Sequence, residues 1–342
     1  MQQGTKVGSD SLEILNNLRA VAAIMVCLYH SAFLLSKNFP QATAMLDIGQ
    51  EGVYVFFVIS GMVMPWSLEK ISYRLSDFFA FMGKRIVRLH PPMVLSACLV
   101  AFSSWGFLSS GAHNPWKLLA ASATLSAPLL NVPWVNDVYW TLFVEMQYYI
   151  YIALAFPLLN SNSRITRSAT VASLLALSFV SLLWQGHAVK LTLAFHLPIF
   201  LMGFYLYLIY KRKINEMDFW LGLIACSSVC AYMTGVLHGV GFRITLVAVA
   251  TSIIIKFTSN GMNWLSKIGE VSYSLYLIHW PIISSVVYFT WGKLDAPWAS
   301  ASAFAFIQIT AIIAAFLFYR VIEKPALQWA KKIKFSQRPA TS

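Results

Sequence analysis

The sequence predicts an all-α, polytopic membrane protein with about ten transmembrane helices and with both termini in the cytoplasm. Composition is the first observation: hydrophobic residues make up 58% of the 342 residues, and charged residues only 11%. Soluble domains are less apolar on average and contain about 25% charged residues. The second observation is a series of long apolar runs. The third is the uneven distribution of basic residues between them.

The apolar runs are long enough to cross a bilayer, which takes roughly 17–25 helical residues. No internal repeat or long soluble insertion interrupts them. We expect one membrane domain over residues 1–342, with a transmembrane core at about 12–328 and a basic cytoplasmic tail at 329–342. The first run is too long for the apolar part of a cleaved signal peptide, so it should remain as a helix. The runs centre on residues 14–35, 52–68, 93–110, 138–159, 168–185, 190–210, 218–237, 242–258, 272–291 and 299–322.

Basic residues are concentrated on one side of these runs. With ten spans, 20 of the 25 Lys and Arg residues fall on the same side as the termini, and five fall on the other. Cytoplasmic loops of membrane proteins carry this excess, so both termini are predicted to be cytoplasmic. The net charge of +12 then indicates topology and contact with membrane lipid, and no nucleic-acid partner is expected.

Ionisable residues inside an apolar run are informative because they need a partner or water. Arg19 and His30 lie in the first run, in the segment NNLRAVAAIMVCLYH. In a helix they would be about 16 Å apart along the axis and within about 20° of one face. His30 is a candidate general base or acid, or a histidine that packs against a neighbouring helix. Arg19 either lines the same cavity or extends to the inner interface.

Glu145 is the acidic residue that lies well inside a run, in WTLFVEMQYYIYIAL. It is too far from a helix end to reach water easily, which favours a paired or catalytic role. We expect it to orient the His30 imidazole or to raise its basicity. Contact between the two side chains is an assumption of this interpretation.

A basic cluster, KRIVRLHPP, precedes the third run. Arg85 and Arg88 are three residues apart, so in a helix both guanidinium groups share one face and can bind phosphate or carboxylate. The alternative is an anchor at the positive inner surface. Pro91 and Pro92 are expected to disrupt the start of the helix and to open a cavity there.

Several signatures of soluble enzymes are missing: the sequence contains no G-x-S-x-G, H-E-x-x-H, G-x-x-x-x-G-K-[ST] or dinucleotide-binding motif. Serine catalysis and metal-dependent hydrolysis therefore have no support. The cysteines all fall inside apolar runs and form no C-x-x-C pair, so we expect buried apolar residues and no metal. Five tryptophans near the outer ends can stack on sugars or form an interfacial belt: Trp105, Trp134, Trp140, Trp291 and Trp298.

Six segments occur in a definite order along the chain. They are Arg19-x(10)-His30, GVYVFFVISGMVM at 52–64, KRIVRLHPP at 84–92, VYWTLFVEMQYYIYIAL at 138–154, IGEVSYSLYLIHWPI at 268–282 and FYRVIEKPALQ at 318–328. In this order they resemble the acyltransferase 3 family from about residue 12 to 328. Members are integral membrane enzymes, mostly bacterial, that O-acetylate extracytoplasmic glycans.

The resemblance implies roles for particular residues. The first-helix Arg and His of the family are functionally required, and its cytoplasmic R-x-x-R is thought to engage acyl-coenzyme A. The W-x-L-x-x-E and Y-x-x-H elements have less settled roles. By position, catalytic roles are implied for Arg19, His30 and Glu145, donor binding for Arg85 and Arg88, and substrate binding or support for Trp140, Tyr276 and His279.

The implied reaction is transfer of acetyl from acetyl-CoA to a glycan or lipid-linked glycan, such as O-antigen or exopolysaccharide, at the bacterial inner membrane. His30 either deprotonates the acceptor hydroxyl or first takes the acetyl group itself. The sequence departs from the family at Tyr54, where many members have an acid, unless Glu51 substitutes one turn earlier. We also expect a stand-alone membrane module without the soluble esterase-like domain that many members carry. The oligomeric state is open.

Two other classes of function fit the composition. A proton-coupled transporter or flippase of a glycan or small solute can use intramembrane Arg, His and Glu side chains as a proton relay. A structural or regulatory membrane protein can bind lipid through basic inner loops. Neither class explains the ordered segments.

Overall fold

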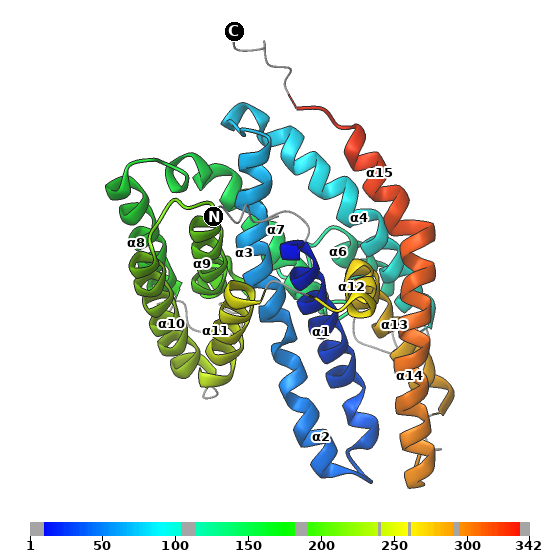
Figure 1. Ribbon diagram of the computed structural model, residues 1–342. Coiled ribbons are helices and arrows are strands. Elements are labelled where there is room, and N and C mark those ends of the chain that lie inside the picture. Colours follow the sequence, from blue (N-terminus) through cyan, green and yellow to red (C-terminus); the bar gives the residue numbers. More distant parts are fainter. Residues whose placement is uncertain are drawn as a thin grey trace. The chain divides into compact units, whose positions relative to one another are not determined.

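The computed structural model describes residues 10–103, 114–181, 191–238, 241–258, 261–290 and 294–335 (Figure 1). Within these ranges the chain forms helices and no strands, so the predicted all-α class is confirmed. The main helices are α1 (Asp10–Ser31), α2 (Pro40–Leu46), α3 (Gly52–Lys70), α4 (Phe78–Ser103), α6 (Pro115–Ala123), α7 (Tyr139–Leu159), α8 (Arg164–Val180), α9 (Leu193–Tyr210), α10 (Glu216–His238), α11 (Gly241–Phe257), α12 (Asn263–Glu270), α13 (Ser272–Thr290), α14 (Pro297–Phe318) and α15 (Lys324–Lys332).

Short 3₁₀ turns connect several of these helices. They are η1 (Ala32–Leu35), η2 (Asp47–Glu51) and η3 (Leu75–Asp77). A five-residue π-helical turn, η6 (Tyr319–Glu323), joins α14 to α15 without a break. Such turns interrupt the regular hydrogen-bond pattern of a helix and are frequent at functional sites.

Seven helical segments within the described ranges are long and apolar enough to cross a membrane. They are Glu13–Leu35, Pro40–Lys70, Leu75–Ser103, Tyr139–Leu159, Leu193–Tyr210, Glu216–Gly235 and Pro297–Lys332. The chain is thus a polytopic membrane protein. Three further predicted spans correspond to the helices α8, α11 and α13, of 17, 17 and 19 residues. The count of ten and the location of the termini stay predictions.

The third predicted span differs from the observed helix. We expected it at 93–110, with Pro91 and Pro92 disrupting its start, but α4 is one continuous helix over Phe78–Ser103 with both prolines inside it. Prolines are tolerated within membrane helices because neighbouring groups satisfy the backbone that they release. Residues 104–110 of the prediction, including Trp105, lie outside the described residues, as does Trp291.

The chain divides into two compact units, each built from separate stretches. The first comprises residues 1–61 and 198–317, and the second comprises residues 62–197 and 318–342. Neither unit corresponds to a single stretch of sequence, because α3 and α9 each contribute to both. The prediction of one domain over the whole chain is not tested by this division.

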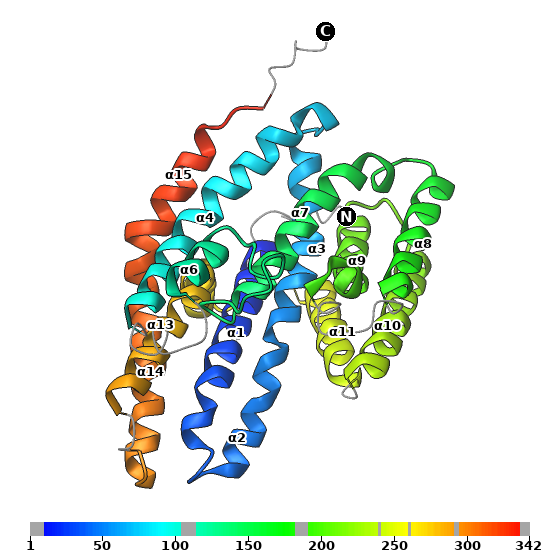
Figure 2. The same cartoon turned by 180° about the vertical axis from the view of Figure 1, so that it is seen from behind.

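In the first unit, α1 packs closely against α12, α13 and η2 (Figures 1 and 2). Small residues make this approach possible. A Cβ atom on Gly269 of α12 would lie 1.9 Å from the Asn16 carbonyl oxygen, and one on Gly49 of η2 would lie 2.3 Å from the Met25 carbonyl oxygen. These glycines let neighbouring segments contact the α1 backbone directly.

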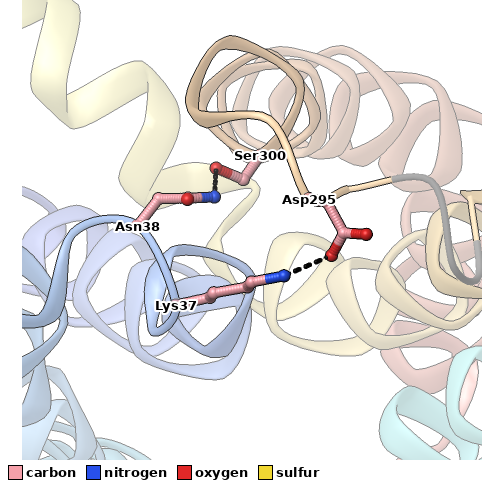
Figure 3. A network of polar contacts seen from close by, with 4 residues as sticks. All are labelled: Lys37, Asn38, Asp295 and Ser300. Carbon is pink, nitrogen blue, oxygen red and sulfur yellow. Dashed lines mark hydrogen bonds and ion pairs between the residues drawn. The ribbon is translucent and has the colours of Figure 1, made fainter.

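Polar contacts join the segment that follows α1 and η1 to the start of α14 and the residues just before it (Figure 3). Lys37 Nζ forms an ion pair with Asp295 at 2.6 Å, and Asn38 Nδ2 donates a hydrogen bond to Ser300 Oγ at 3.1 Å. Further along α14, Gln308 Nε2 donates to Ser31 Oγ at 2.7 Å. Since Ser31 follows His30 directly, these contacts hold the end of α1 that carries His30.

In the second unit, α4 packs against α15, α6 and α7. Both ribbon views show α15 running alongside α4 (Figures 1 and 2). Tyr139 at the start of α7 is buried, and its hydroxyl donates to the Met93 carbonyl at 2.9 Å and also contacts Ser96. This contact fixes α7 to the half of α4 that follows the two prolines.

Candidate active site

Arg19 and His30 both lie on α1, as predicted, and both side chains are half-buried. The segment forms an uninterrupted helix because it contains no proline or glycine and consists mainly of apolar residues that favour lipid or protein surroundings. One straight helix therefore carries both residues on one face. Arg19 lies nearer the N-terminal end, and His30 lies one residue before the helix ends.

The structure brings His30 together with His279 of α13, a residue 249 positions away in sequence. Nδ1 of His30 lies 3.1 Å from Nε2 of His279. The rings are stacked, with centroids 5.2 Å apart and an interplanar angle of 25°. His279 is fully buried, whereas His30 is half-buried. We call these two residues the histidine pair.

The hydrogen bonds of the histidine pair determine which nitrogens carry hydrogen when both rings are neutral. Nδ1 of His279 lies 3.1 Å from the carbonyl oxygen of Leu275. Because a carbonyl only accepts, Nδ1 of His279 is protonated and its Nε2 is an acceptor. His30 must then donate from Nδ1 to this acceptor. The lone pair of His30 Nε2 is left available as a base or nucleophile.

Aromatic rings surround the histidine pair. The Trp280 ring meets the His30 ring edge-on, with centroids 5.1 Å apart, and the Tyr29 ring lies 5.0 Å from it. Tyr276 lies 6.0 Å from His279 and contacts Phe56 on its other side. Tyr276 therefore supports His279 from the same helix, one turn away. These rings limit the rotation of both imidazoles and shield them from water.

Arg85 and Arg88 lie on α4 in the second unit, three residues apart on a continuous helix, as their spacing predicts. Arg85 donates to Ser67 Oγ at 3.3 Å, and its guanidinium lies 5.2 Å from the centre of the Phe81 ring. Nε of Arg88 is buried and has no hydrogen-bond partner within the described residues. Arg88 thus has donor capacity that no described protein group uses.

Glu145 and Tyr149 of α7 lie in the same unit. The Tyr149 hydroxyl donates to Glu145 Oε1 at 2.5 Å, and the Arg85 guanidinium lies 5.4 Å from the Tyr149 ring centre. Tyr149 is also within electrostatic range of Arg88. We call Arg85, Arg88, Glu145 and Tyr149 the arginine cluster. Contact between Glu145 and His30 stays a prediction, and the partner of His30 seen within the first unit is His279.

The two prolines of α4 lie within one helical turn after Arg88. Proline has no N–H, so Pro91 and Pro92 cannot donate the helical hydrogen bonds that the carbonyls of Val87 and Arg88 would otherwise accept. These carbonyls lie on the same turn as the guanidinium groups.

Trp140 lies against His196, with ring centroids 5.7 Å apart. His196 is buried, and Trp140 therefore supports a core histidine of the second unit. Of the other tryptophans near predicted outer ends, Trp134 packs on Tyr139, whereas Trp298 is 75% exposed, as expected for an interfacial residue.

Sequence reasoning missed several residues of the site. Gln308, which donates a hydrogen bond to Ser31, is a polar residue in an apolar span. A search of the spans for amide side chains as well as ionisable ones would have found it. Trp280 follows His279 directly, and Tyr149 lies one turn after Glu145. Both residues lie within the six ordered segments named above. Their contacts depend on tertiary packing, which no local pattern reveals.

Within the described residues, no group of three His, Cys, Asp or Glu side chains is arranged to hold a metal ion. The four cysteines are free thiols; Cys27, Cys226 and Cys230 are buried as expected. Cys98 is exposed, so the prediction was wrong there, because it lies on a face of α4 that no described segment covers.

The described residues define an integral membrane protein, with the histidine pair in its first unit and the arginine cluster in its second. The sequence model of the family described as an acyltransferase domain matches residues 12–320. The chain belongs to this family, the acyltransferase 3 family, and is a membrane O-acyltransferase.

Three relatives illustrate the similarity. The O-acetyl transferase of Shigella phage Sf6 is 24% identical over 294 residues, which cover 79% of this chain and 84% of the relative. BcsY of Komagataeibacter xylinus is 23% identical over 361 aligned positions, covering 95% and 85%. The O-acetyltransferase OatA of Staphylococcus aureus is 26% identical over 363 positions, covering 91% of this chain but 56% of OatA. No solved structure matches the chain.

Proposed function

We propose that this O-acyltransferase transfers acetyl from cytoplasmic acetyl-CoA to a hydroxyl of an extracytoplasmic glycan, such as O-antigen or exopolysaccharide, at the bacterial inner membrane. The observation that carries the proposal is the histidine pair, which leaves Nε2 of His30 available to activate a hydroxyl. Relatives named as O-acetyltransferases support acetyl as the acyl group. The arginine cluster supports a donor that carries phosphates.

The donor binds through the arginine cluster in this proposal. Acetyl-CoA carries phosphates and two amide groups, and Arg88 offers an unused guanidinium N–H. The Tyr149 ring packs against the Arg85 guanidinium and its hydroxyl donates to Glu145. Glu145 is therefore proposed as a positioning residue for the donor as well as the predicted partner of His30. Arg19 lies on the same helix face as His30 but about 16 Å from it along the axis, so it is proposed to line the same cavity at a second depth.

The acceptor hydroxyl gives its proton to Nε2 of His30 as its oxygen attacks the thioester carbonyl. A tetrahedral intermediate forms, and the carbon–sulfur bond then breaks. The leaving thiolate takes the proton back from His30, so the products are free CoA and an acetyl ester. His279 accepts a hydrogen bond from Nδ1 throughout and stabilises the imidazolium that exists between the two proton transfers.

A covalent route uses the same nitrogen. Nε2 of His30 would attack the thioester first and expel the CoA thiolate. The acetyl-imidazole would then pass its acetyl group to the glycan hydroxyl, whose proton goes to the thiolate. The two routes differ in whether labelled protein accumulates without acceptor. Rapid quenching of enzyme with labelled acetyl-CoA, in the absence of glycan, distinguishes them.

The decisive experiment measures incorporation of radiolabel from acetyl-CoA into surface polysaccharide. Membranes contain wild-type protein, His30→Ala protein or neither. We expect label with wild type alone. Wild-type incorporation by correctly folded His30→Ala protein would overturn the role of His30. Equal label in all three membranes would contradict acetyl transfer and favour the transporter interpretation.

The donor site has its own test. We expect Arg85→Ala with Arg88→Ala to raise the acetyl-CoA concentration for half-maximal rate at least tenfold, because each charge-assisted hydrogen bond contributes about 1.5–3 kcal/mol. Lys84→Ala is the matched control, since Lys84 lies on the same helix but stacks on Phe335 at 4.0 Å. Unchanged donor saturation in the double variant would refute the assignment.

A further inference from the structure

A second polar cluster lies next to His30 in the first unit. It consists of Tyr29 of α1, Asp47 and Glu51 of η2, and Arg243 of α11, and we call it the outer cluster. Arg243 Nη1 lies 2.6 Å from Asp47 Oδ2, and Arg243 Nε lies 3.5 Å from Glu51 Oε1. Tyr29 is within electrostatic range of all three charged groups.

Close packing of η2 on α1 brings this cluster to His30. A Cβ atom on Gly49 would lie 2.9 Å from Cβ of Tyr29, so only glycine allows η2 to approach so closely. Asp47 and Glu51 stand on either side of Gly49 in the same turn. The Tyr29 ring lies 5.0 Å from the His30 ring. The outer cluster therefore meets the candidate base through its own aromatic member, Tyr29.

Glu51 is the unusual member of the outer cluster. Its side chain is only 5% exposed, yet its contact with Arg243 is 3.5 Å long, and it makes no hydrogen bond with any described residue. A buried carboxylate normally accepts several hydrogen bonds, because burial without them is costly. Arg243 is shared with Asp47, which holds it at a much shorter distance. Glu51 therefore retains capacity to accept hydrogen bonds from a ligand.

The chemistry of the outer cluster fits a sugar. Carboxylates accept hydrogen bonds from neighbouring hydroxyls, a guanidinium donates to ring or carbonyl oxygens, and a tyrosine ring can lie against the apolar face of a pyranose. Two carboxylates and one guanidinium give the cluster a formal charge of −1. An acidic sugar would be repelled by this charge, whereas an uncharged one would not.

We propose that the outer cluster is the acceptor subsite, in which Asp47, Glu51 and Arg243 bind hydroxyls of an uncharged sugar residue next to His30. The subsite rests on the proposed function, since it requires a glycan acceptor. To that function the subsite adds the class of sugar, an uncharged one, and the residues that select this sugar. These residues bind the acceptor and leave proton transfer to His30.

The test titrates the glycan fraction that takes up label in the assay above and compares acceptor and donor saturation for single variants. We expect Glu51→Gln and Asp47→Asn each to raise the acceptor concentration for half-maximal rate about tenfold, with acetyl-CoA saturation unchanged. Asp295→Asn is the matched control, because Asp295 also forms a 2.6 Å ion pair in this unit but is 79% exposed and outside the cluster. It should leave both values unchanged.

The direction in which acceptor binding changes distinguishes a failure of the subsite from a failure of the proposed function. If both variants fold and bind the acceptor as well as wild type, or better, the subsite is refuted, and improved binding would indicate an acidic sugar. If Glu51→Gln does not fold, the half-exposed Asp47→Asn decides by the same criterion. If His30→Ala still transfers label, or if no glycan accepts it, the proposed function itself fails, and the subsite with it.

Discussion

Replacing His279 with leucine should slow the reaction while leaving substrate binding intact. The change removes the acceptor for Nδ1 of His30, which lies 3.1 Å from His279 Nε2. Both tautomers of His30 then become accessible. In addition, the imidazolium formed during proton transfer loses its hydrogen-bond partner in a buried site.

The size of the effect follows from the change in this hydrogen bond during the reaction. A bond between neutral groups contributes about 1 kcal/mol, and one to a charged group contributes about 1.5–3 kcal/mol. The bond to His279 therefore stabilises the transition state by about 0.5–2 kcal/mol more than the resting enzyme. That difference corresponds to a decrease in kcat of roughly 2- to 30-fold.

Steady-state acetyl transfer by purified protein in detergent or nanodiscs measures this effect, with KM for both substrates expected to stay near wild type. His279→Gln is the informative companion, because its amide oxygen can reach the position of Nε2 and should recover part of the rate. Ile278→Val, a neighbouring buried position on α13, controls for repacking. A His279→Leu protein with wild-type kcat and thermal stability would refute the role of the histidine pair.

Two further predictions concern stability. Gly269→Ala should lower the free energy of unfolding by about 1–3 kcal/mol, because its Cβ would overlap the Asn16 carbonyl. In Gly235→Ala of α10 the added Cβ meets nothing within 4 Å, so this variant should be more stable by about 0.5–1 kcal/mol. Thermal unfolding in detergent compares the two variants, and equal shifts would contradict the packing argument. Lys37 holds the pKa of the exposed Asp295 carboxyl below its usual value. This ion pair therefore stabilises the fold above the unfolded-state pKa of about 3.9, and the contribution is lost as the pH falls through the lowered pKa. The melting difference between wild type and Asp295→Asn should accordingly be present near neutral pH and vanish in acid, and a difference that persists in acid would exclude this cause.

Local patterns predicted the elements that depend on local physics. The all-α membrane class follows from composition and run length, because backbone groups in lipid must be satisfied within the helix. The shared face of Arg85 and Arg88 follows from their three-residue spacing alone. The error at Pro91 and Pro92 arose because a proline's effect on a helix depends on the surrounding groups, and the sequence does not reveal those groups.

The sequence by itself determined that this protein lies in a membrane, that it belongs with the acyltransferase 3 enzymes, and which ionisable side chains stand inside its spans. Only the tertiary structure decided which of them meet. His30 contacts His279 across 249 positions, and Asp47 contacts Arg243 across 196. Such contacts depend on how helices pack against one another, and apolar runs carry little information about packing partners because one lipid-compatible face resembles another.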